Sequence, residues 1–243
     1  MSGETMIEKV RASNAPLSLM LAGRQRSHVL FVLSDSVDPQ DARFLEWYRG
    51  PYRDEVGRSP AVVGVQHYRQ HDVDITQGVM SRLPFRYLGI YQIVLDGARE
   101  ATALIGKIAM LHEQQSFARS PATWLYYPLS EKVGRAPTSS PSMLTIAFAN
   151  STPGDDAEFQ EWYATRHIRH ALNVPELVSG QCFARTQFQS PGALEAKFQM
   201  IAVYEQEGTP ADILKSFEVI PESVFQFPTL DTTRFAEWVY GPV

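Results

Sequence analysis

The feature that most constrains the fold is an internal similarity between the two halves of the 243-residue chain. The stretch DARFLEWYRGPYRDEV begins at Asp41, and DAEFQEWYATRHIRHA begins 115 positions later at Asp156. Both keep a Phe and a Glu-Trp-Tyr run in register, and a proline follows each at Pro60 and Pro175. Two of the chain's four tryptophans fall in these matching runs. Agreement of this kind indicates a tandem repeat.

The similarity continues downstream at a separation of 113 residues. YLGIYQIVLDG matches QMIAVYEQEG through Tyr91 and Tyr204, and WLYYP matches WVYGP through Tyr127 and Tyr240. Short β-branched apolar runs alternate with helical segments, so each half is expected to follow the order β-α-β-β-α-β. The first helix of each half should begin after Asp41 and Asp156. The expected strands are 28–34, 61–69, 86–95 and 123–129, then 143–150, 177–185, 197–206 and 234–241; the second helices are 97–112 and 209–219.

This order predicts an α+β fold made of two ferredoxin-like βαββαβ repeats. Each four-stranded sheet carries helices on one face only, so two fused units can bury their bare faces against each other as an intrachain pseudo-twofold α/β barrel. The expected divisions are an N-terminal extension at 1–26, repeat one at 27–133, a linker at 134–142 and repeat two at 143–243. The aromatic strand residues expected to fill or line the barrel are Tyr87, Tyr91, Tyr126, Tyr127, Phe198, Tyr204, Trp238 and Tyr240.

Composition excludes several classes of partner. The formal net charge is -5 and the sequence has no long basic run, so we expect neither nucleic acid nor a membrane surface as a partner. No apolar run approaches the roughly 18 residues that a membrane span needs. The single cysteine, Cys182, excludes an intrachain disulfide and is expected to be a small buried apolar residue rather than a nucleophile. We therefore expect a cytoplasmic protein.

The helix and strand of the second half resemble a known family. EFQEWYATRHIRHALNVPELVSGQCFAR, followed by a strand ending in Tyr-Glu, is similar to the dimeric α/β-barrel superfamily and specifically to its EthD-like branch. That branch typically shows a Phe-x-x-Trp-Tyr…His-(Ile/Val) helix, a proline and then a strand. Most members are single repeats that dimerise, so this chain resembles a fused pair. The superfamily includes cofactor-free oxygenases, polyketide cyclases, lactone isomerases, aldoxime dehydratases and haem enzymes.

The candidate catalytic residues lie on the first helix of the second half. Helical spacing places Arg166, His167 and His170 on the same face as Phe159 and Trp162. We expect the apolar members to face the sheet and to carry both histidines toward the interior. A histidine there can serve as a general acid or base, and an arginine can hold a developing anion. The alternative is that both histidines occupy the last helical turn, favoured by the helix dipole, and contact only solvent.

The first half differs at these positions. Tyr52 replaces His167, Glu55 replaces His170, and Pro51 replaces Arg166. Proline at this depth is expected to interrupt or kink the helix. The two halves are therefore interpreted as one competent site and one degenerate site. The residues expected to bind substrate are Trp162, Tyr163, Tyr91, Tyr204, His67 and Tyr52.

His67 requires two interpretations. Strand alternation places it on one face of its strand with Val65 and Arg69, where it could be a second acid or base. A hydrogen-bonded core histidine is the alternative. No metal site is expected, because His167 and His170 lack a third ligand at suitable spacing. No phosphate-binding glycine loop occurs either.

Together these features predict a cofactor-independent enzyme. It would act on a small hydrophobic, aromatic or polyketide-like carbonyl compound by His-mediated proton transfer, as a lyase, isomerase, cyclase or oxygenase. The alternatives are a non-catalytic ligand-binding or accessory protein of a catabolic pathway and, less strongly supported, a haem enzyme with one axial histidine. A homodimer formed through residues 1–26 is compatible with the sequence.

Overall fold

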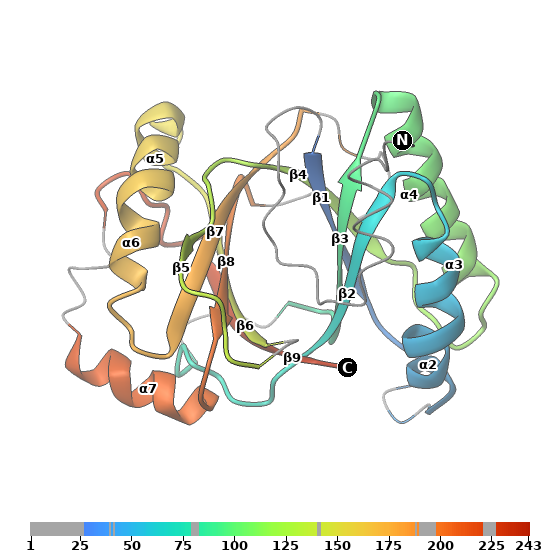
Figure 1. Ribbon diagram of the computed structural model, residues 1–243, viewed down its shortest axis with the longest axis horizontal. Helices are drawn as coiled ribbons and strands as arrows, with labels where there is room; N and C mark the ends of the chain where they lie inside the picture. The colour runs from blue at the N-terminus through green and yellow to red at the C-terminus, as the bar shows by residue number, and fades with distance from the viewer. Residues whose placement is uncertain are drawn as a thin grey trace, which may run out of the picture.

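Two units of the same topology make up the chain in the computed structural model (Figure 1). The structure describes residues 27–38, 40, 42–78, 83–139, 142–187, 189, 198–220 and 227–243, so the expected extension at 1–26 and Asp41 lie outside it. The first unit comprises β1 (Ser27–Ser34), α2 (Ala42–Trp47), η1 (Tyr48–Tyr52), α3 (Arg53–Gly57), β2 (Val62–Gln70), β3 (Tyr87–Val94), α4 (Ala98–Glu113) and β4 (Ala122–Pro128). The second comprises β6 (Met143–Ala149), α5 (Asp156–Trp162), η2 (Tyr163–His167), α6 (Ile168–Ala171), β7 (Leu177–Arg185), β8 (Met200–Gln206), α7 (Pro210–Val219) and β9 (Ala236–Pro242).

The strands close into an antiparallel barrel. Their order is β4-β1-β3-β2-β9-β6-β8-β7, and β4 also pairs with β7. A short strand, β5 (Val133–Gly134), adds to the other edge of β7. Within each unit the order is that of a ferredoxin-like sheet, and the two seams β2–β9 and β4–β7 are equivalent under a pseudo-twofold. The predicted α+β fold, with two ferredoxin-like units forming an intrachain barrel, is confirmed.

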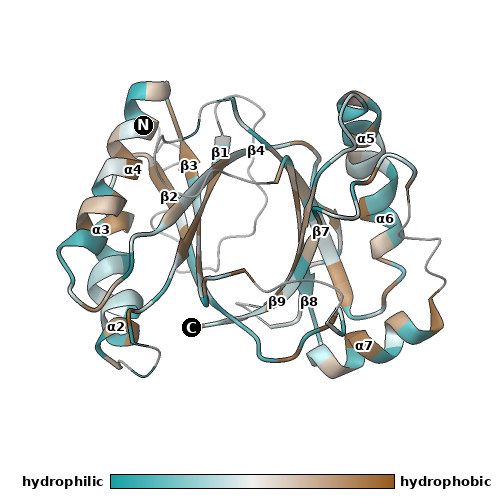
Figure 2. Cartoon of the chain, turned by 180° about the vertical axis from the view of Figure 1, so that it is seen from behind, coloured by the Kyte–Doolittle hydropathy of each residue, from teal (hydrophilic) through white to brown (hydrophobic). Residues whose placement is uncertain are grey.

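Helices cover the outside of the strand ring. Figure 2 shows α2, α3 and α4 on one side of the barrel and α5, α6 and α7 on the opposite side. α7 begins with Pro210 directly after Thr209, and Thr209 and Asp212 form a capping box that satisfies free amide groups at the helix start. None of the helices in the described part of the chain has the length and hydropathy that crossing a bilayer requires.

In the described part of the chain, the buried apolar residues form three cores rather than one. The barrel interior is filled by inward residues such as Phe31, Ile146 and Trp238. Each unit has a second core between its sheet and its helices, so both faces of most strands are buried. Three predicted barrel residues, Tyr87, Tyr91 and Tyr204, lie in these outer cores instead. Tyr127 is also misassigned, because its side chain is exposed.

The register of the last strand also differs from the expectation. β4 places Tyr126 opposite Val29, and β9 places Tyr240 opposite Leu144. Val29 and Leu144 are equivalent positions of the two units, so Tyr126, and not Tyr127, is the counterpart of Tyr240. The match of Tyr91 with Tyr204 is correct, since these residues pair with Leu30 and Thr145 at equivalent positions.

Candidate functional site

A π turn interrupts the first helix of each unit at the same place. η1 spans Tyr48–Tyr52 and η2 spans Tyr163–His167. Such turns are rare and occur frequently at functional sites. In both units, the carbonyl of the first π-turn residue receives a hydrogen bond from the facing strand. The His67 Nδ1–H donates to Tyr48 O at 3.0 Å, and the Cys182 thiol donates to Tyr163 O at 3.4 Å.

The π turn changes the interpretation of Pro51. This proline lies inside η1, and the helix continues beyond it into α3. The α-helix is interrupted at Pro51, as expected, but by a π turn and not by the end of the helix. η2 adopts the same π turn with Arg166 at the equivalent position, so the proline is not its cause. The two π turns have another feature in common. In each, the carbonyl of the first π-turn residue accepts a hydrogen bond from a side chain of the facing strand.

His167 lies on the buried side of η2. Its ring stacks on Tyr163, with centroids 4.8 Å apart and planes 10° apart, and contacts Trp162 at 4.9 Å. Burial lowers the pKa of His167 to about 3, and the neighbouring His170 adds to this shift. Its Nδ1 atom is buried and has no hydrogen-bond partner among the described residues. His167 is therefore a neutral imidazole with one unused ring nitrogen.

His170 and Arg166 do not join His167 in the interior. Both side chains are exposed, so the prediction that His170 faces the core is wrong. The π turn adds a residue to the helical turn, and the helix face after it no longer follows the spacing of a continuous α-helix. Arg166 instead borders a surface hollow of about 230 Å³. The hollow is lined by Glu158, Glu161, Trp162, Thr165, Arg166 and Phe227.

Trp162 connects this hollow to His167. One of its contacts is the His167 ring, and another is Phe227, which it stacks at 4.4 Å with planes 11° apart. Tyr163, the other predicted binding residue of this helix, is fully buried and packs on Phe159 at 5.3 Å. The structure thus brings Trp162, Tyr163 and His167 together, while Arg166 lies at the rim.

In the first unit, the histidine at the helix–strand contact is His67, which belongs to the strand β2 and not to the helix. His67 Nδ1 must carry the proton that it donates to the Tyr48 carbonyl, so Nε2 accepts from the Tyr91 hydroxyl at 2.8 Å. Burial lowers the pKa of His67 to about 3, and the charge of Arg53 contributes to the shift. Both ring nitrogens of His67 are occupied, as expected for a hydrogen-bonded core histidine.

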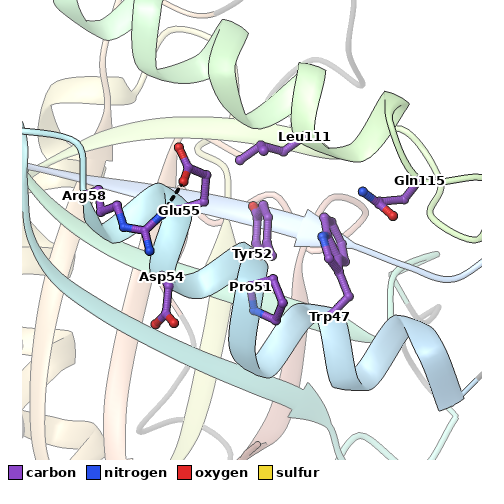
Figure 3. A pocket seen from close by; sticks show the side chains of 8 residues that line it. All are labelled: Trp47, Pro51, Tyr52, Asp54, Glu55, Arg58, Leu111 and Gln115. Atoms are coloured by element: carbon purple, nitrogen blue, oxygen red, sulfur yellow. Dashed lines mark hydrogen bonds and ion pairs between the residues drawn. The ribbon is translucent and has the colours of Figure 1, made fainter.

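Tyr52 occupies the position that His167 has in the second unit. It stacks on Tyr48 at 5.5 Å and contacts Trp47 at 4.7 Å, which reproduces the aromatic stack around His167. Trp47 and Tyr52 line a pocket of about 340 Å³ between the first helix and α4. Figure 3 shows Tyr52 near the middle of the lining residues, between Glu55 and Trp47. The other lining residues are Pro51, Asp54, Glu55, Arg58, Leu111 and Gln115. This volume falls within the range of small-molecule sites, roughly 300–1,000 Å³.

Sequence reasoning missed two ionisable residues whose pKa values the protein shifts, the buried His112 and the partly buried Glu237. His112, at the end of α4, accepts a hydrogen bond from the Ser34 hydroxyl through Nε2 at 3.0 Å and donates from Nδ1 to Ile108 O at 3.0 Å. Burial lowers its pKa to about 4. Glu237 lies on β9, and burial raises its pKa to about 7. The sequence signal for Glu237 was its position as a single acid inside an otherwise apolar strand. The signal for His112 was its place at the end of the series of apolar positions that α4 buries.

Tyr204 is the remaining predicted binding residue. It is buried in the outer core of the second unit, and its hydroxyl has no hydrogen-bond partner among the described residues. Gly180 makes room for its ring: a Cβ at this glycine would come within 2.7 Å of Tyr204 Cδ1. The Tyr204 hydroxyl and His167 Nδ1 are thus two of several buried polar atoms of the second unit that have no hydrogen-bond partner among the described residues.

The comparisons with known proteins concern the fold. No protein-family model matches the sequence, and no curated protein matches it significantly. An anthrone oxidase-like protein superposes with a TM-score of 0.55 at 10% identity, over 90% of this chain and 92% of that one. A protein of Fusobacterium nucleatum, provisionally named a monooxygenase, gives 0.54 at 9% identity, over 88% and 92%. A chlorite dismutase variant of Candidatus Nitrospira defluvii gives 0.51 at 10% identity, over 90% and 93%. This chain shares the dimeric α/β-barrel fold with these proteins.

The three buried histidines His67, His112 and His167 are poorly placed to serve as the axial ligand of a haem group. His67 and His112 use both ring nitrogens for internal hydrogen bonds. The ring of His167 lies flat on Tyr163, and the neighbouring hollow of about 230 Å³ is below the usual size of even a small-molecule site. Within the described ranges, no three His, Cys, Asp or Glu side chains are grouped so that they could hold a metal ion.

Proposed function

We propose that the chain is a cofactor-independent enzyme that acts on a small apolar carbonyl or phenolic compound in the outer core of the second unit. The observation that carries this proposal is the buried, neutral His167 with an unused Nδ1, held against an aromatic wall. An apolar cavity with a few converging polar groups is the general form of a small-molecule site. The oxidase-like and monooxygenase names of structurally similar proteins agree with a small-molecule enzyme.

Each residue has a distinct role in this proposal. Trp162 and Tyr163 form the wall on which an aromatic substrate packs, and the Tyr204 hydroxyl donates a hydrogen bond to it. His167 exchanges a proton with, or donates a hydrogen bond to, the substrate oxygen. Arg166 attracts an anionic substrate at the rim, while His170 lowers the proton affinity of His167.

The first unit is proposed to be the degenerate one. Its histidine is closed off by the Tyr91 and Tyr48 hydrogen bonds, and Tyr52 fills the place of His167. We propose that both units descend from one EthD-like ancestor, with boundaries at 27–133 and 143–243 and a linker at 134–142. Equivalent π turns and equivalent aromatic stacks support this origin. Cys182 is buried and unpaired, which agrees with the cytoplasmic location that we propose.

The test replaces His167 by glutamine and measures turnover of a panel containing anthrone and 2-tetralone. Loss of an acid–base residue is expected to reduce the rate by roughly 100-fold or more. Arg169→Gln, on the exposed face of the same helix, is the matched control and should retain the wild-type rate. Wild-type binding of these compounds without any turnover would instead support the ligand-binding alternative.

A further inference from the structure

The chain that follows β4 covers the outer edge of β7 in the second unit. It runs antiparallel to β7 from Pro128 to Arg135, through the short strand β5. The first contact beyond β4 is a hydrogen bond of 2.8 Å from Leu129 N to Cys182 O, and the last is one of 2.9 Å from Arg135 N to Val178 O. With this cover, every residue of β7 except the last is buried.

The equivalent edge of β2 is covered only in part by described residues. β9 pairs with Tyr68–Gln70, and Val243 N then donates to His67 O at 3.1 Å. This bond is the counterpart of the bond from Leu129 to Cys182, because His67 and Cys182 hold equivalent positions in the repeat. Among the strands of the described part of the chain, none continues along β2 beyond this bond.

The rest of this edge presents backbone groups to another strand. The hydrogen-bonding groups of an antiparallel strand alternate between its two sides, so those of Val65 and Val63 face the same side as those of His67. Neither valine forms a hydrogen bond there with a described residue. Both are partly exposed, whereas Val178 and Gly180, at the equivalent positions of β7, are buried. An unpaired edge of this kind is a template for a further strand.

The sequence before β1 contains a counterpart of the covering segment. PLSLMLAGR, residues 16–24, matches PLSEKVGR, residues 128–135, through Pro-Leu-Ser at its start and Gly-Arg at its end. Both stretches come shortly before the first strand of their unit, β1 or β6. The internal repeat therefore extends upstream to residue 16 and includes the segment that covers β7 in the second unit.

The apolar pattern of this stretch is that of a strand with one buried face. Leu17, Leu19 and Leu21 are separated by single residues, so in a strand they share a face. Alignment on Pro-Leu-Ser places Leu21 at the position of Val133, whose side chain packs against the outer core of the second unit. In the first unit, Val65 borders the equivalent core from the open edge.

The connection to β1 is long enough for this arrangement. Leu21 lies six residues before Ser27, where β1 begins, and six extended residues span about 20 Å. A strand added to β2 lies three strand spacings from β1, since β3 separates β1 from β2. Val65 is level with Leu30 of β1, three residues from Ser27. The diagonal from a residue beside Val65 to Ser27 is then about 18 Å.

We propose that Ser18–Ala22 is an additional edge strand of the first unit, antiparallel to β2, with Leu21 opposite Val65. It takes the place that β5 has in the second unit. Backbone hydrogen bonds to Val65 hold it, and its leucines cover the partly exposed side chains of β2. An occupied edge cannot pair with the edge of a second copy, so the segment also prevents edge-to-edge association.

The first experiment traps the pair as a disulfide. Opposed residues of a hydrogen-bonded antiparallel pair have Cα atoms about 5.5 Å apart, within the range that a disulfide spans. Leu21→Cys combined with Val65→Cys is expected to oxidise within one chain, and the native Cys182 does not compete because it is buried. Ala12→Cys combined with Val65→Cys is the control and should keep both new thiols reduced. Equal bridging in both variants, or none in the first, would refute the proposal.

The second experiment measures amide hydrogen exchange at Val65 without any added cysteine. Leu21→Pro removes the amide that donates to Val65 O and should accelerate the exchange of the Val65 amide by roughly tenfold or more. Val133→Pro is the matched variant of the second unit and should act in the same way at Gly180.

Two outcomes would overturn the assignment. One is a Val65 amide that Leu21→Pro leaves unchanged while Gly180 responds to Val133→Pro. The other is a Val65 protection that rises with protein concentration, together with a disulfide between two chains, which would assign the edge to a second copy of the protein.

Discussion

At the scale of single residues, the two units differ by reciprocal substitutions around one helix–strand contact. The first unit has Tyr52 on the helix and His67 on the strand, and the second has His167 on the helix and Cys182 on the strand. Each unit therefore buries one histidine at this contact, from opposite sides. Only the second leaves a ring nitrogen without a partner among the described residues. This asymmetry is why we place the reaction in the second unit.

The position of a glycine determines the direction of the strand tyrosine in each unit, Tyr91 in the first and Tyr204 in the second. Gly89 lies opposite His67, and Ala202 lies opposite Cys182. The ring of Tyr91 lies over Gly89, where a Cβ would come within 2.6 Å of it. Ala202 carries such a Cβ, and Tyr204 lies over Gly180 instead. The missing methyl group at Gly89 thus allows Tyr91 to reach His67.

We therefore predict that Gly89→Ala displaces Tyr91 and breaks its hydrogen bond to His67. Overpacking and an unsatisfied buried nitrogen should together lower the free energy of unfolding by roughly 2–4 kcal/mol. Urea denaturation measures this loss, and the nitrogen NMR shift of His67 Nε2 reports the broken bond. Gly106→Ala is the control: this exposed position within α4 has free space around it, so alanine should stabilise by about 0.5–1 kcal/mol. An unchanged His67 signal in Gly89→Ala would contradict the prediction.

At the scale of elements, the π turn determines how the first helix of each unit contacts its facing strand. It turns the carbonyl of Tyr48 or Tyr163 toward a hydrogen-bond donor on the facing strand. It also accommodates Pro51, which in a regular α-helix would clash with the carbonyl four residues earlier. The first unit therefore depends on its π turn more than the second does.

Deleting one residue from each π turn tests this difference. Deletion of Arg49 or Ala164 should convert the turn to an α turn without rotating the rest of the helix. The Arg49 deletion then places Pro51 in a regular helix and should cost about 3 kcal/mol or more. The Ala164 deletion loses only a weak thiol hydrogen bond and should cost about 1 kcal/mol. Unfolding curves in urea compare the two. Adding Pro51→Ala to the Arg49 deletion should restore part of the lost stability. An equal loss of unfolding free energy in the two deletions, or no such recovery, would argue against this role of the proline.

At the scale of the whole molecule, the two units share a core and join their sheets. The barrel interior contains residues of both, and the seams β2–β9 and β4–β7 join their sheets. Ile75, from the loop after β2 of the first unit, is part of the outer core of the second. Ionisable groups buried in either unit should therefore act on a single unfolding transition.

This leads to a prediction about pH. Burial lowers the pKa of His67, His112 and His167 to about 3, 4 and 3, so below pH 6.5 the unfolded state binds protons that the folded state does not. Stability should then fall as the pH falls, by about 1.4 kcal/mol per pH unit for each histidine. Glu237 acts in the opposite direction between about pH 4.5 and 7, because its folded pKa is raised. The three histidines lower the free energy of unfolding as the pH falls, and Glu237 raises it. The net result is a loss of about 3 kcal/mol per pH unit between pH 6 and 5.

Urea denaturation at pH 5, 6, 7 and 8 measures this dependence. A marginally stable domain, with roughly 5–15 kcal/mol in total, should lose much of its stability before pH 5. Glu237→Gln should remove the opposing contribution and make the decline steeper between pH 5 and 7. A stability that stays constant from pH 7 to pH 5 would contradict the burial of neutral histidines.

The sequence by itself determined the order of the strands and helices, the two-unit barrel, and the position of the aromatic stack around Trp162 and Tyr163. These follow from local periodicity and from a repeat that keeps its core residues in register. Only the tertiary structure decided which way the strand tyrosines face, because both faces of these strands are buried and alternation cannot distinguish one core from the other. It also placed His170 outside, since the π turn shifts the helix face, and it enclosed Glu237, whose surroundings come from η2, β6 and β8. Such an environment is created by packing between distant segments, and no local pattern encodes it.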